Sequence, residues 1–170
     1  MQTHTVGRQA DNPFSSLAFD SVTMNEYMFD TNIFNKILDG QIDPSKLSSK
    51  DCYVTHVQFD EIQATKDKDR RLKLEEVFSQ VVSTQLPTES FVLDVSRLDE
   101  AKLSDGVRYE QLLQRLNELN KSKLNNVQDA LIDETALTNG ITLVTEDQDL
   151  AQVITEFGGF VCNLQDVIGA

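Results

Sequence analysis

Four of the 28 acidic residues in this 170-residue chain lie at positions that a solvating surface charge rarely occupies. Asp30 directly follows a short apolar run, and Asp147 follows a β-branched run in the same way. In an open parallel sheet, ligands bind in the crevice beyond the carboxyl ends of the strands. Glu61 and Asp129 lie within the first two turns of predicted helices, where the helix dipole favours negative charge. This layout permits the four carboxylates to converge on one site.

Such a cluster of carboxylates would be costly without a cation, because like charges raise one another's pKa values. Oxygen-only ligands suit the hard cations Mg²⁺ and Mn²⁺. One or two such ions can orient a water molecule, lower its pKa and hold a scissile phosphate. No histidine general base is then required, and the chain has only His4 and His56. The chemistry predicted from these residue types is metal-assisted hydrolysis.

Each of the four residues also has a simpler interpretation. Asp30 could do no more than cap a helix, and Glu61 could be a solvated helix residue. Asp129 could compensate a helix dipole, and Asp147 could belong to an acidic turn at 146–149. The ordered combination of the four, rather than any one of them, supports a shared site.

Strands and helices are predicted to alternate along the chain. Short apolar or β-branched runs predict strands, and apolar residues at helical spacing predict helices. This alternation favours a three-layer α/β/α sandwich with a largely parallel central sheet. The strands are expected at 27–29, 52–54, 91–93, 141–144 and 160–162, and the helices around 33–38, 57–62, 67–82, 105–119, 127–137 and 148–156.

Two helix starts carry a capping signal. Thr55 is followed three residues later by Gln58, and Asn125 by Gln128, which is the spacing of a capping box. Gly140 can end the second of these helices in the left-handed conformation. The signals predict helices that begin next to Glu61 and Asp129.

Composition and length favour one domain, because 39% of the residues are hydrophobic and 25% are charged. Residues 1–25 are polar and irregular and are interpreted as a leader, with the folded domain at 26–170. Cys52 and Cys162 lie in strand-like runs and are expected to be reduced core thiols. The sequence shows no signal peptide and no run of the ~20 apolar residues that a membrane helix needs. A soluble cytoplasmic protein is the expectation.

The formal net charge of −13 excludes a protein that coats DNA with its whole surface, because Lys and Arg supply the affinity of such proteins. Any contact with nucleic acid must therefore be local. The densest basic stretch follows Glu61 closely and could bind a phosphate backbone. Alternatively, it is a solvated helix whose basic residues pair with neighbouring acids between residues 67 and 76. Its basic residues are Lys66, Lys68, Arg70, Arg71 and Lys73.

Four segments resemble the acidic motifs of PIN domains, a family named for the N-terminus of PilT. Phe29-Asp30-Thr31-Asn32, between an apolar strand and a helix, is similar to the opening motif. Thr55, with Glu61 six residues later, resembles the second acidic element. Asp129-Ala130-Leu131-Ile132 resembles the third, and Leu143-Val144-Thr145-Glu146-Asp147 resembles the fourth. The order and context of the motifs agree over most of the chain.

The resemblance implies a Mg²⁺- or Mn²⁺-dependent ribonuclease, often the toxin of a bacterial toxin–antitoxin pair of the VapC type. An antitoxin protein would then be a partner, RNA the substrate and a homodimer the expected assembly. The resemblance also implies that Asn32 holds Asp30 and that Thr145 supports the site by hydrogen bonding. The implied metal ligands and catalytic residues are Asp30, Glu61, Asp129 and Asp147.

Three features depart from the family pattern. Asp133 and Glu134 occupy helix positions where many relatives have small residues. Asp133 lies one turn after Asp129, so it is either an extra metal ligand or a solvated neighbour. The segment 67–124 is long for a minimal toxin, and the leader has no counterpart.

Two other function classes remain open. The first is a PIN fold without catalysis that binds RNA or protein. The second is another aspartate-based α/β protein. A dehalogenase-like phosphatase would require a second Asp where Asn32 stands, and a receiver domain would require a Lys at a late strand end.

Overall fold

The computed structural model describes residues 25–121 and 123–169. The predicted leader therefore lies outside the described residues, except for Asn25. In the part of the chain that the structure describes, no helix is both long and apolar enough to cross a membrane. Cys52 and Cys162 are both free thiols, as expected, with Cys52 buried and Cys162 partly buried.

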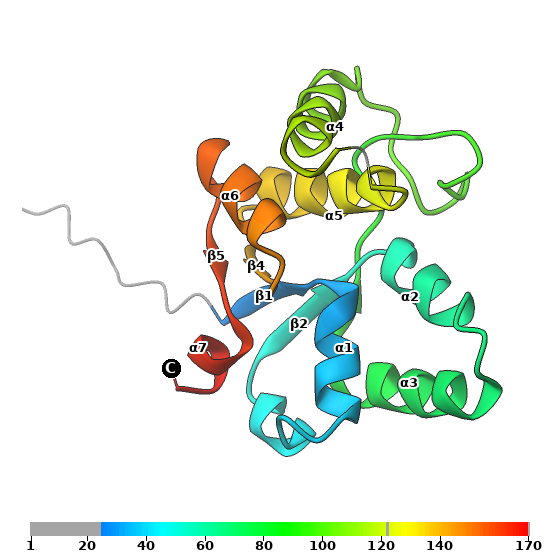
Figure 1. The fold of residues 1–170 in the computed structure, drawn as a ribbon, viewed down its shortest axis with the longest axis vertical. Helices are drawn as coiled ribbons and strands as arrows, with labels where there is room; N and C mark the ends of the chain where they lie inside the picture. Colours follow the sequence, from blue (N-terminus) through cyan, green and yellow to red (C-terminus); the bar gives the residue numbers. More distant parts are fainter. Residues whose placement is uncertain (1–24, 122, 170) are drawn as a thin grey trace, which may run out of the picture.

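A five-stranded parallel sheet forms the centre of the molecule (Figure 1). The strand order is β3-β2-β1-β4-β5, so the first strand of the sequence lies in the middle. In the register of the central pair, Phe29 lies opposite Val144. The largely parallel sheet predicted from the sequence is confirmed. The strands are β1 (Glu26–Phe29), β2 (Asp51–Val54), β3 (Thr84–Gln85), β4 (Thr142–Val144) and β5 (Val161–Cys162).

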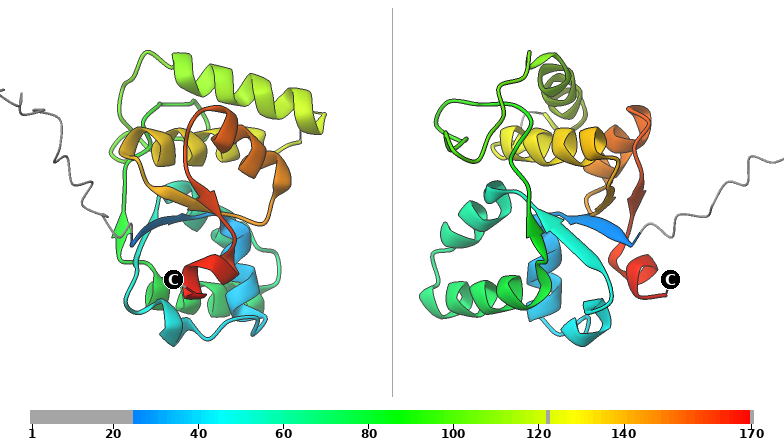
Figure 2. Two further views of the ribbon diagram at one scale, coloured as in Figure 1. Left: turned by 90° about the vertical axis from the view of Figure 1, so that its left-hand side faces the viewer. Right: turned by 180° about the vertical axis from the view of Figure 1, so that it is seen from behind.

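Helices cover both faces of the sheet, as Figures 1 and 2 show. Helices α1, α3 and α7 lie with the 3₁₀ helix η1 on one side, and α4, α5 and α6 lie on the other. Helix α2 contributes to both cores, through Ile62 on one side and Val57 on the other. The helices are α1 (Thr31–Leu38), η1 (Pro44–Leu47), α2 (His56–Gln63), α3 (Lys68–Val81), α4 (Val107–Asn120), α5 (Asn126–Asn139), α6 (Gln148–Glu156) and α7 (Leu164–Gly169).

The alternation of side chains along β1 explains the two cores. Phe29 packs into the core beneath α1 and α3, whereas Met28 packs into the core beneath α5 and α6. Both side chains are fully buried. Each burial of this kind contributes about 1.5–3 kcal/mol. The central strand is thereby fixed from both faces, and with it the position of the residue that follows it.

The strand predicted at 91–93 is wrong. Leu93 is 78% exposed and leads into a turn at Asp94, whose φ of 66° is left-handed. The sheet position is instead taken by β3, which pairs with β2. β3 is short and exposed and lies at the sheet edge, so its sequence carries no apolar signal. η1 and α7 were also not predicted.

Candidate active site

The structure brings the four predicted acidic residues to a single cleft of about 360 Å³, lined by Asp30, Glu61, Asp129 and Asp147. The sheet explains this convergence. β1 and β4 are neighbours and parallel, and the Asp30 amide donates to the Val144 carbonyl at 3.1 Å. The chain therefore leaves both strands at the same sheet edge.

Asp30 occupies the N-cap position of α1 but makes no capping hydrogen bond with its side chain. Its Oδ2 instead accepts from Asn32 Nδ2 at 2.5 Å and from Thr145 Oγ1 at 2.7 Å. Burial raises the pKa of the Asp30 carboxyl, although the hydrogen bond from Thr145 opposes the shift. Both of these side-chain contacts engage Oδ2 and hold the carboxylate at the cleft.

Glu61 reaches the cleft from α2, and the Thr31 hydroxyl donates to its Oε2. Burial raises the pKa of Glu61, and the charge of Asp30 adds to this effect. A solvated helix residue would not be held in this way. Thr31 belongs to the opening motif, but no sequence pattern predicts its contact with Glu61.

Asp147 combines two roles in the structure. Its Oδ1 accepts from the amides of Asp149 and Leu150 and so caps α6. Its Oδ2 forms an ion pair with Lys123 Nζ at 3.2 Å. One carboxylate oxygen therefore caps a helix, which the sequence interpretation as a turn residue did not include, while the other pairs with a cation that sequence reasoning missed.

Asp129 lies in the first turn of α5 and is 4% exposed. Burial, together with the charges of Asp30 and Glu61, raises its pKa to about 8. The predicted capping box at Asn125 is wrong, because the Asn125 side chain makes no capping hydrogen bond. Its amide Nδ2 lies 3.4 Å from Asp129 Oδ1 instead. The Asn125 side chain therefore faces the cleft instead of capping the helix.

Asp133 lies beneath the cleft and is fully buried, so the interpretation as a solvated neighbour is wrong. Neither of its carboxylate oxygens has a hydrogen-bond partner within the described residues. Burial raises its pKa well above the usual range, and the charges of Asp129, Asp30 and Asp147 act in the same direction. A buried polar group without a partner costs about 1–3 kcal/mol, and a charged one costs more. A cation nearby would remove this cost.

The acidic side chains share the cleft without forming a closed ligand set. Within residues 25–121 and 123–169, no three His, Cys, Asp or Glu side chains are arranged to hold one metal ion together. Glu61 is engaged by Thr31, and Asp147 is engaged by Lys123. Rotation of these side chains would be needed before they could share a ligand.

Two solved structures resemble this architecture. One is VapBC2 from Rickettsia felis bound to a DNA fragment from its promoter, with a TM-score of 0.51 and 17% identity, covering 81% of this chain and 97% of that chain. The other is PAE2754 from Pyrobaculum aerophilum, with a TM-score of 0.52 and 14% identity, covering 85% of this chain and 93% of that chain. The chain has the PIN fold. No protein-family model and no curated protein matches the sequence.

Within the PIN fold, the predicted basic stretch lies beside the cleft rather than in it. Arg70 pairs with Asp39 at 2.9 Å and donates to Asn35, which lines the cleft. Arg71 lies 3.8 Å from Glu75, so one neighbouring-acid pair of the alternative interpretation is present. The other three members, Lys66, Lys68 and Lys73, are exposed.

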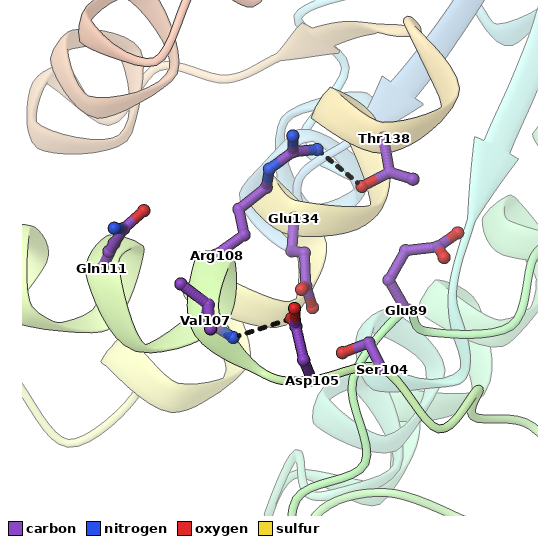
Figure 3. A pocket seen from close by; sticks show the side chains of 8 residues that line it. All are labelled: Glu89, Ser104, Asp105, Val107, Arg108, Gln111, Glu134 and Thr138. Atoms are coloured by element: carbon purple, nitrogen blue, oxygen red, sulfur yellow. Dashed lines mark hydrogen bonds between the residues drawn. The ribbon is translucent and has the colours of Figure 1, made fainter.

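A second hollow lies between α4 and α5 and contains none of the four acids (Figure 3). Glu134, which departs from the family pattern, lines this hollow and accepts a hydrogen bond from Ser90 at 2.9 Å. Arg108 reaches across the hollow to Thr138. Glu134 is therefore separate from the acidic cleft, unlike its neighbour Asp133.

Proposed function

We propose that this chain is a divalent-metal-dependent endoribonuclease that hydrolyses RNA phosphodiester bonds at the acidic cleft. The observation that carries the proposal is the convergence of Asp30, Glu61, Asp129 and Asp147 on one cleft above the buried Asp133. The raised pKa values of Asp129 and Asp133 indicate that these carboxylates need positive charge to be ionised together.

The donor set fits Mg²⁺ or Mn²⁺, because every candidate ligand is a carboxylate oxygen. Asp30, Glu61 and Asp129 would hold the ion, with Asp147 joining them once its Oδ2 leaves Lys123. A bound dication would supply charge to stabilise a scissile phosphate and would make a water molecule more acidic. Asp133 would compensate the charge of the ion from below or act as a further ligand.

The supporting residues would fix the carboxylates in position. Asn32 and Thr145 both hold Asp30 Oδ2, which restricts rotation of the carboxylate. Thr145 Oγ1 also accepts from the Asp147 amide at 3.0 Å and so links two of the proposed ligands. Preorganised groups of this kind lose little reorganisation energy during a reaction. His56 is buried against Val95 and Glu100 and does not line the cleft.

RNA is the preferred substrate because PIN domains, which the chain resembles in its motifs, include the VapC-type ribonucleases. We propose a toxin–antitoxin role on the same basis, with an antitoxin protein and a second copy of the chain as partners. The basic stretch at residues 66–73 would bind the phosphate backbone beside the cleft, with Arg70 nearest to it through Asn35.

Cleavage assays with and without Mn²⁺ or Mg²⁺ test this function. The purified protein should cut RNA only in the presence of the dication, and Asp30→Asn should lower the rate by at least a hundredfold. The matched control is Asp99→Asn, which changes an exposed aspartate of the 86–106 loop and should retain the rate. Equal cleavage by Asp30→Asn and the wild type would refute the proposal.

A non-catalytic PIN domain that binds RNA or protein is the alternative. Titration calorimetry separates the two functions, because a catalytic site must bind Mn²⁺. If the protein binds no dication at millimolar concentration and cuts neither RNA nor DNA, the non-catalytic function becomes the better account.

A further inference from the structure

Lys123 is the one basic residue, among those that the structure describes, that forms an ion pair with an acid lining the cleft. Its Nζ lies 3.2 Å from Asp147 Oδ2 and 3.4 Å from Asp149 Oδ2. The hydrogen bond to Asp147 raises the pKa of Lys123, so the group is cationic at neutral pH. Burial raises the pKa of Asp129, and the charge of Lys123 opposes that rise. The positive charge of Lys123 therefore acts within the cleft.

The backbone that carries Lys123 is fixed between α4 and α5. The Lys123 amide donates to Asn120 Oδ1 at 3.3 Å. Asn126 is buried, and its amide donates to the same oxygen at 2.8 Å and to Asn117 at 2.7 Å. The Lys123 side chain is 44% exposed. A flexible side chain thus extends from an anchored turn, so its ammonium group can change partners while the turn stays in place.

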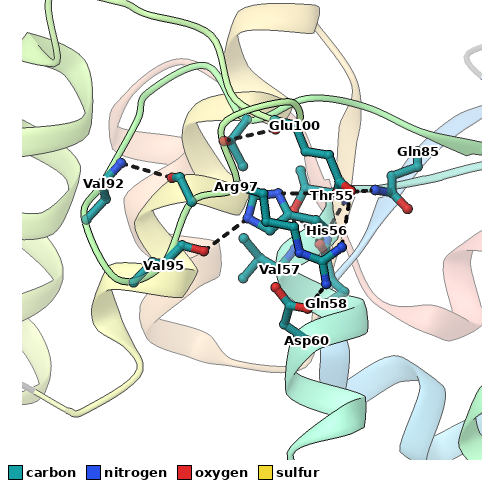
Figure 4. Close-up of polar contacts among 12 residues, drawn as sticks. Thr55, His56, Val57, Gln58, Asp60, Gln85, Val92, Val95, Arg97 and Glu100 are labelled. Atoms are coloured by element: carbon teal, nitrogen blue, oxygen red, sulfur yellow. Dashed lines mark hydrogen bonds and ion pairs between the residues drawn. The ribbon is translucent and has the colours of Figure 1, made fainter.

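Two arginines that come close to the cleft are bound to acids that do not line it. Arg97 pairs with Asp60, as Figure 4 shows. Arg70 holds Asp39 through two contacts of 2.9 and 3.2 Å. An ion bound in the cleft would leave both of these pairs intact, whereas it would take a partner from Lys123. Lys123 is thus the cation whose contacts depend on what occupies the cleft.

A phosphate that enters the cleft needs more positive charge than one dication supplies. A dication carries two charges, fewer than the four acids that line the cleft carry when all are ionised. Clamps that combine Mg²⁺ with Lys or Arg stabilise the charge of phosphoryl groups. The exchange of partners by Lys123 would be inexpensive, because exposed ion pairs contribute little to stability.

We infer that Lys123 is a phosphate-binding residue of the cleft, released to the RNA backbone when a dication takes its place on Asp147. In the metal-free protein, the same ammonium group neutralises Asp147 and Asp149 and does not contact RNA. Metal and RNA therefore bind cooperatively, and part of the coupling depends on this one side chain. The inference rests on the proposed nuclease function and deepens it by naming how metal binding increases the affinity for the substrate.

The first test measures RNA binding instead of cleavage. Fluorescence anisotropy follows a short labelled single-stranded RNA in EDTA and in Ca²⁺, a hard cation that binds oxygen ligands of the same kind. Gel electrophoresis checks that the RNA stays intact. Lys123→Met should weaken RNA binding roughly five- to tenfold in Ca²⁺, as expected for one contact with a charged group, and less than about twofold in EDTA.

The comparison of the two conditions separates this role from that of an ordinary basic surface residue. Such a residue would contribute the same affinity with and without the ion, so an equal loss in EDTA and Ca²⁺ would overturn the inference. No loss in Ca²⁺ would also overturn it. Lys123→Arg should retain binding in Ca²⁺, because it keeps the charge. The matched control is Lys102→Met, which breaks the pair with Glu89 and should change RNA affinity little in either condition.

Asp149→Asn provides an independent test in EDTA. It removes the second partner of Lys123 without changing an acid that lines the cleft. RNA should bind roughly two- to threefold more tightly, as expected for the loss of one exposed ion pair. The gain should largely vanish when Asp149→Asn is combined with Lys123→Met. An equal gain in both backgrounds would mean that only the overall negative charge matters, and the inference would be wrong.

Cleavage assays distinguish the inference from the nuclease on which it rests. If RNA is cut in Mn²⁺ but Lys123→Met loses the same affinity with and without Ca²⁺, the inference fails and the nuclease remains. If the loss depends on the ion while neither RNA nor DNA is cut, Lys123 has the inferred role in a non-catalytic RNA-binding domain.

Discussion

The Thr145 hydroxyl donates to Asp30 Oδ2 at 2.7 Å across a sequence separation of 115 residues. The same hydroxyl accepts from the Asp147 amide, so one side chain connects the ends of β1 and β4. Because Thr145 is only 3% exposed, water cannot replace these contacts.

We expect Thr145→Val to lower both stability and activity. The variant keeps the shape of the side chain but leaves the buried Asp30 carboxylate and the partly buried Asp147 amide with one partner fewer, which costs about 1–3 kcal/mol. Denaturant unfolding should show this loss, and RNA cleavage should fall with it. Thr145→Ser should recover most of the activity, because it retains the hydroxyl. If Ser recovers no more activity than Val, the hydroxyl alone does not account for the role of Thr145.

Asp133→Asn should stabilise the metal-free protein and reduce the stabilisation that a bound metal provides. This buried carboxyl has no hydrogen-bond partner in the described part of the chain, so removing it should raise the melting temperature in EDTA at pH 8, where the acid is most costly. The stabilisation by Mn²⁺ should decrease at the same time. Thermal melts in EDTA and in Mn²⁺ measure both effects. An equal loss of stability in the two conditions would assign Asp133 a purely structural role.

The pH dependence of stability follows from the direction of the pKa shifts. Asp129 has a folded-state pKa of about 8 against a usual value of 3.8. The unfolded chain therefore releases its proton first, and stability falls as pH rises through this interval. Asp30, Glu61 and Asp133 are shifted in the same direction. In EDTA, the free energy of unfolding should decrease from pH 5 to pH 8.

Mn²⁺ should reverse this trend, because the ion favours the ionised carboxylates. Its stabilising effect should therefore be larger at pH 8 than at pH 5. Urea unfolding at both pH values, with and without the ion, provides the measurement. In Asp129→Asn, the decrease between the two pH values should be smaller. A metal-free protein that becomes more stable towards pH 8 would contradict the assignment of Asp129.

Lys123→Met should increase the affinity for Mn²⁺. The Lys123 ammonium group pairs with Asp147 at 3.2 Å and with Asp149 at 3.4 Å, so it competes with an ion for the same oxygens. We expect Mn²⁺ binding to tighten several-fold by calorimetry. Stability should change little, because exposed ion pairs contribute about 0–1 kcal/mol.

The control for this experiment is Lys102→Met, which breaks the ion pair with Glu89 away from the cleft. It should leave Mn²⁺ affinity unchanged. Weaker binding in Lys123→Met alone would mean that Lys123 positions Asp147 for the ion instead of competing with it.

The sequence predicted secondary structure correctly where the local residue pattern and the tertiary environment favour the same conformation. The apolar run before Asp30 forms a central strand because both of its faces are buried, and Gly140 ends α5 with a left-handed φ of 67°. The Thr55 capping box forms as predicted. The apolar run at residues 91–93 predicted a strand wrongly, because it lies in an anchored turn. The strand β3 was missed, because its conformation depends on pairing with β2 rather than on an apolar pattern.

Sequence by itself determined the alternation of strands and helices, and with it the placement of acidic residues after β1 and β4. It could not determine what each carboxylate contacts, because those contacts join segments far apart in the chain. Tertiary structure alone decided that Asp133 is buried with no hydrogen-bond partner within residues 25–121 and 123–169, and that Lys123 reaches Asp147. It also decided that the Asn125 side chain contacts Asp129 instead of capping α5. The physical reason is that burial and charge depend on distances in space, whereas helix and strand signals depend on neighbours in sequence.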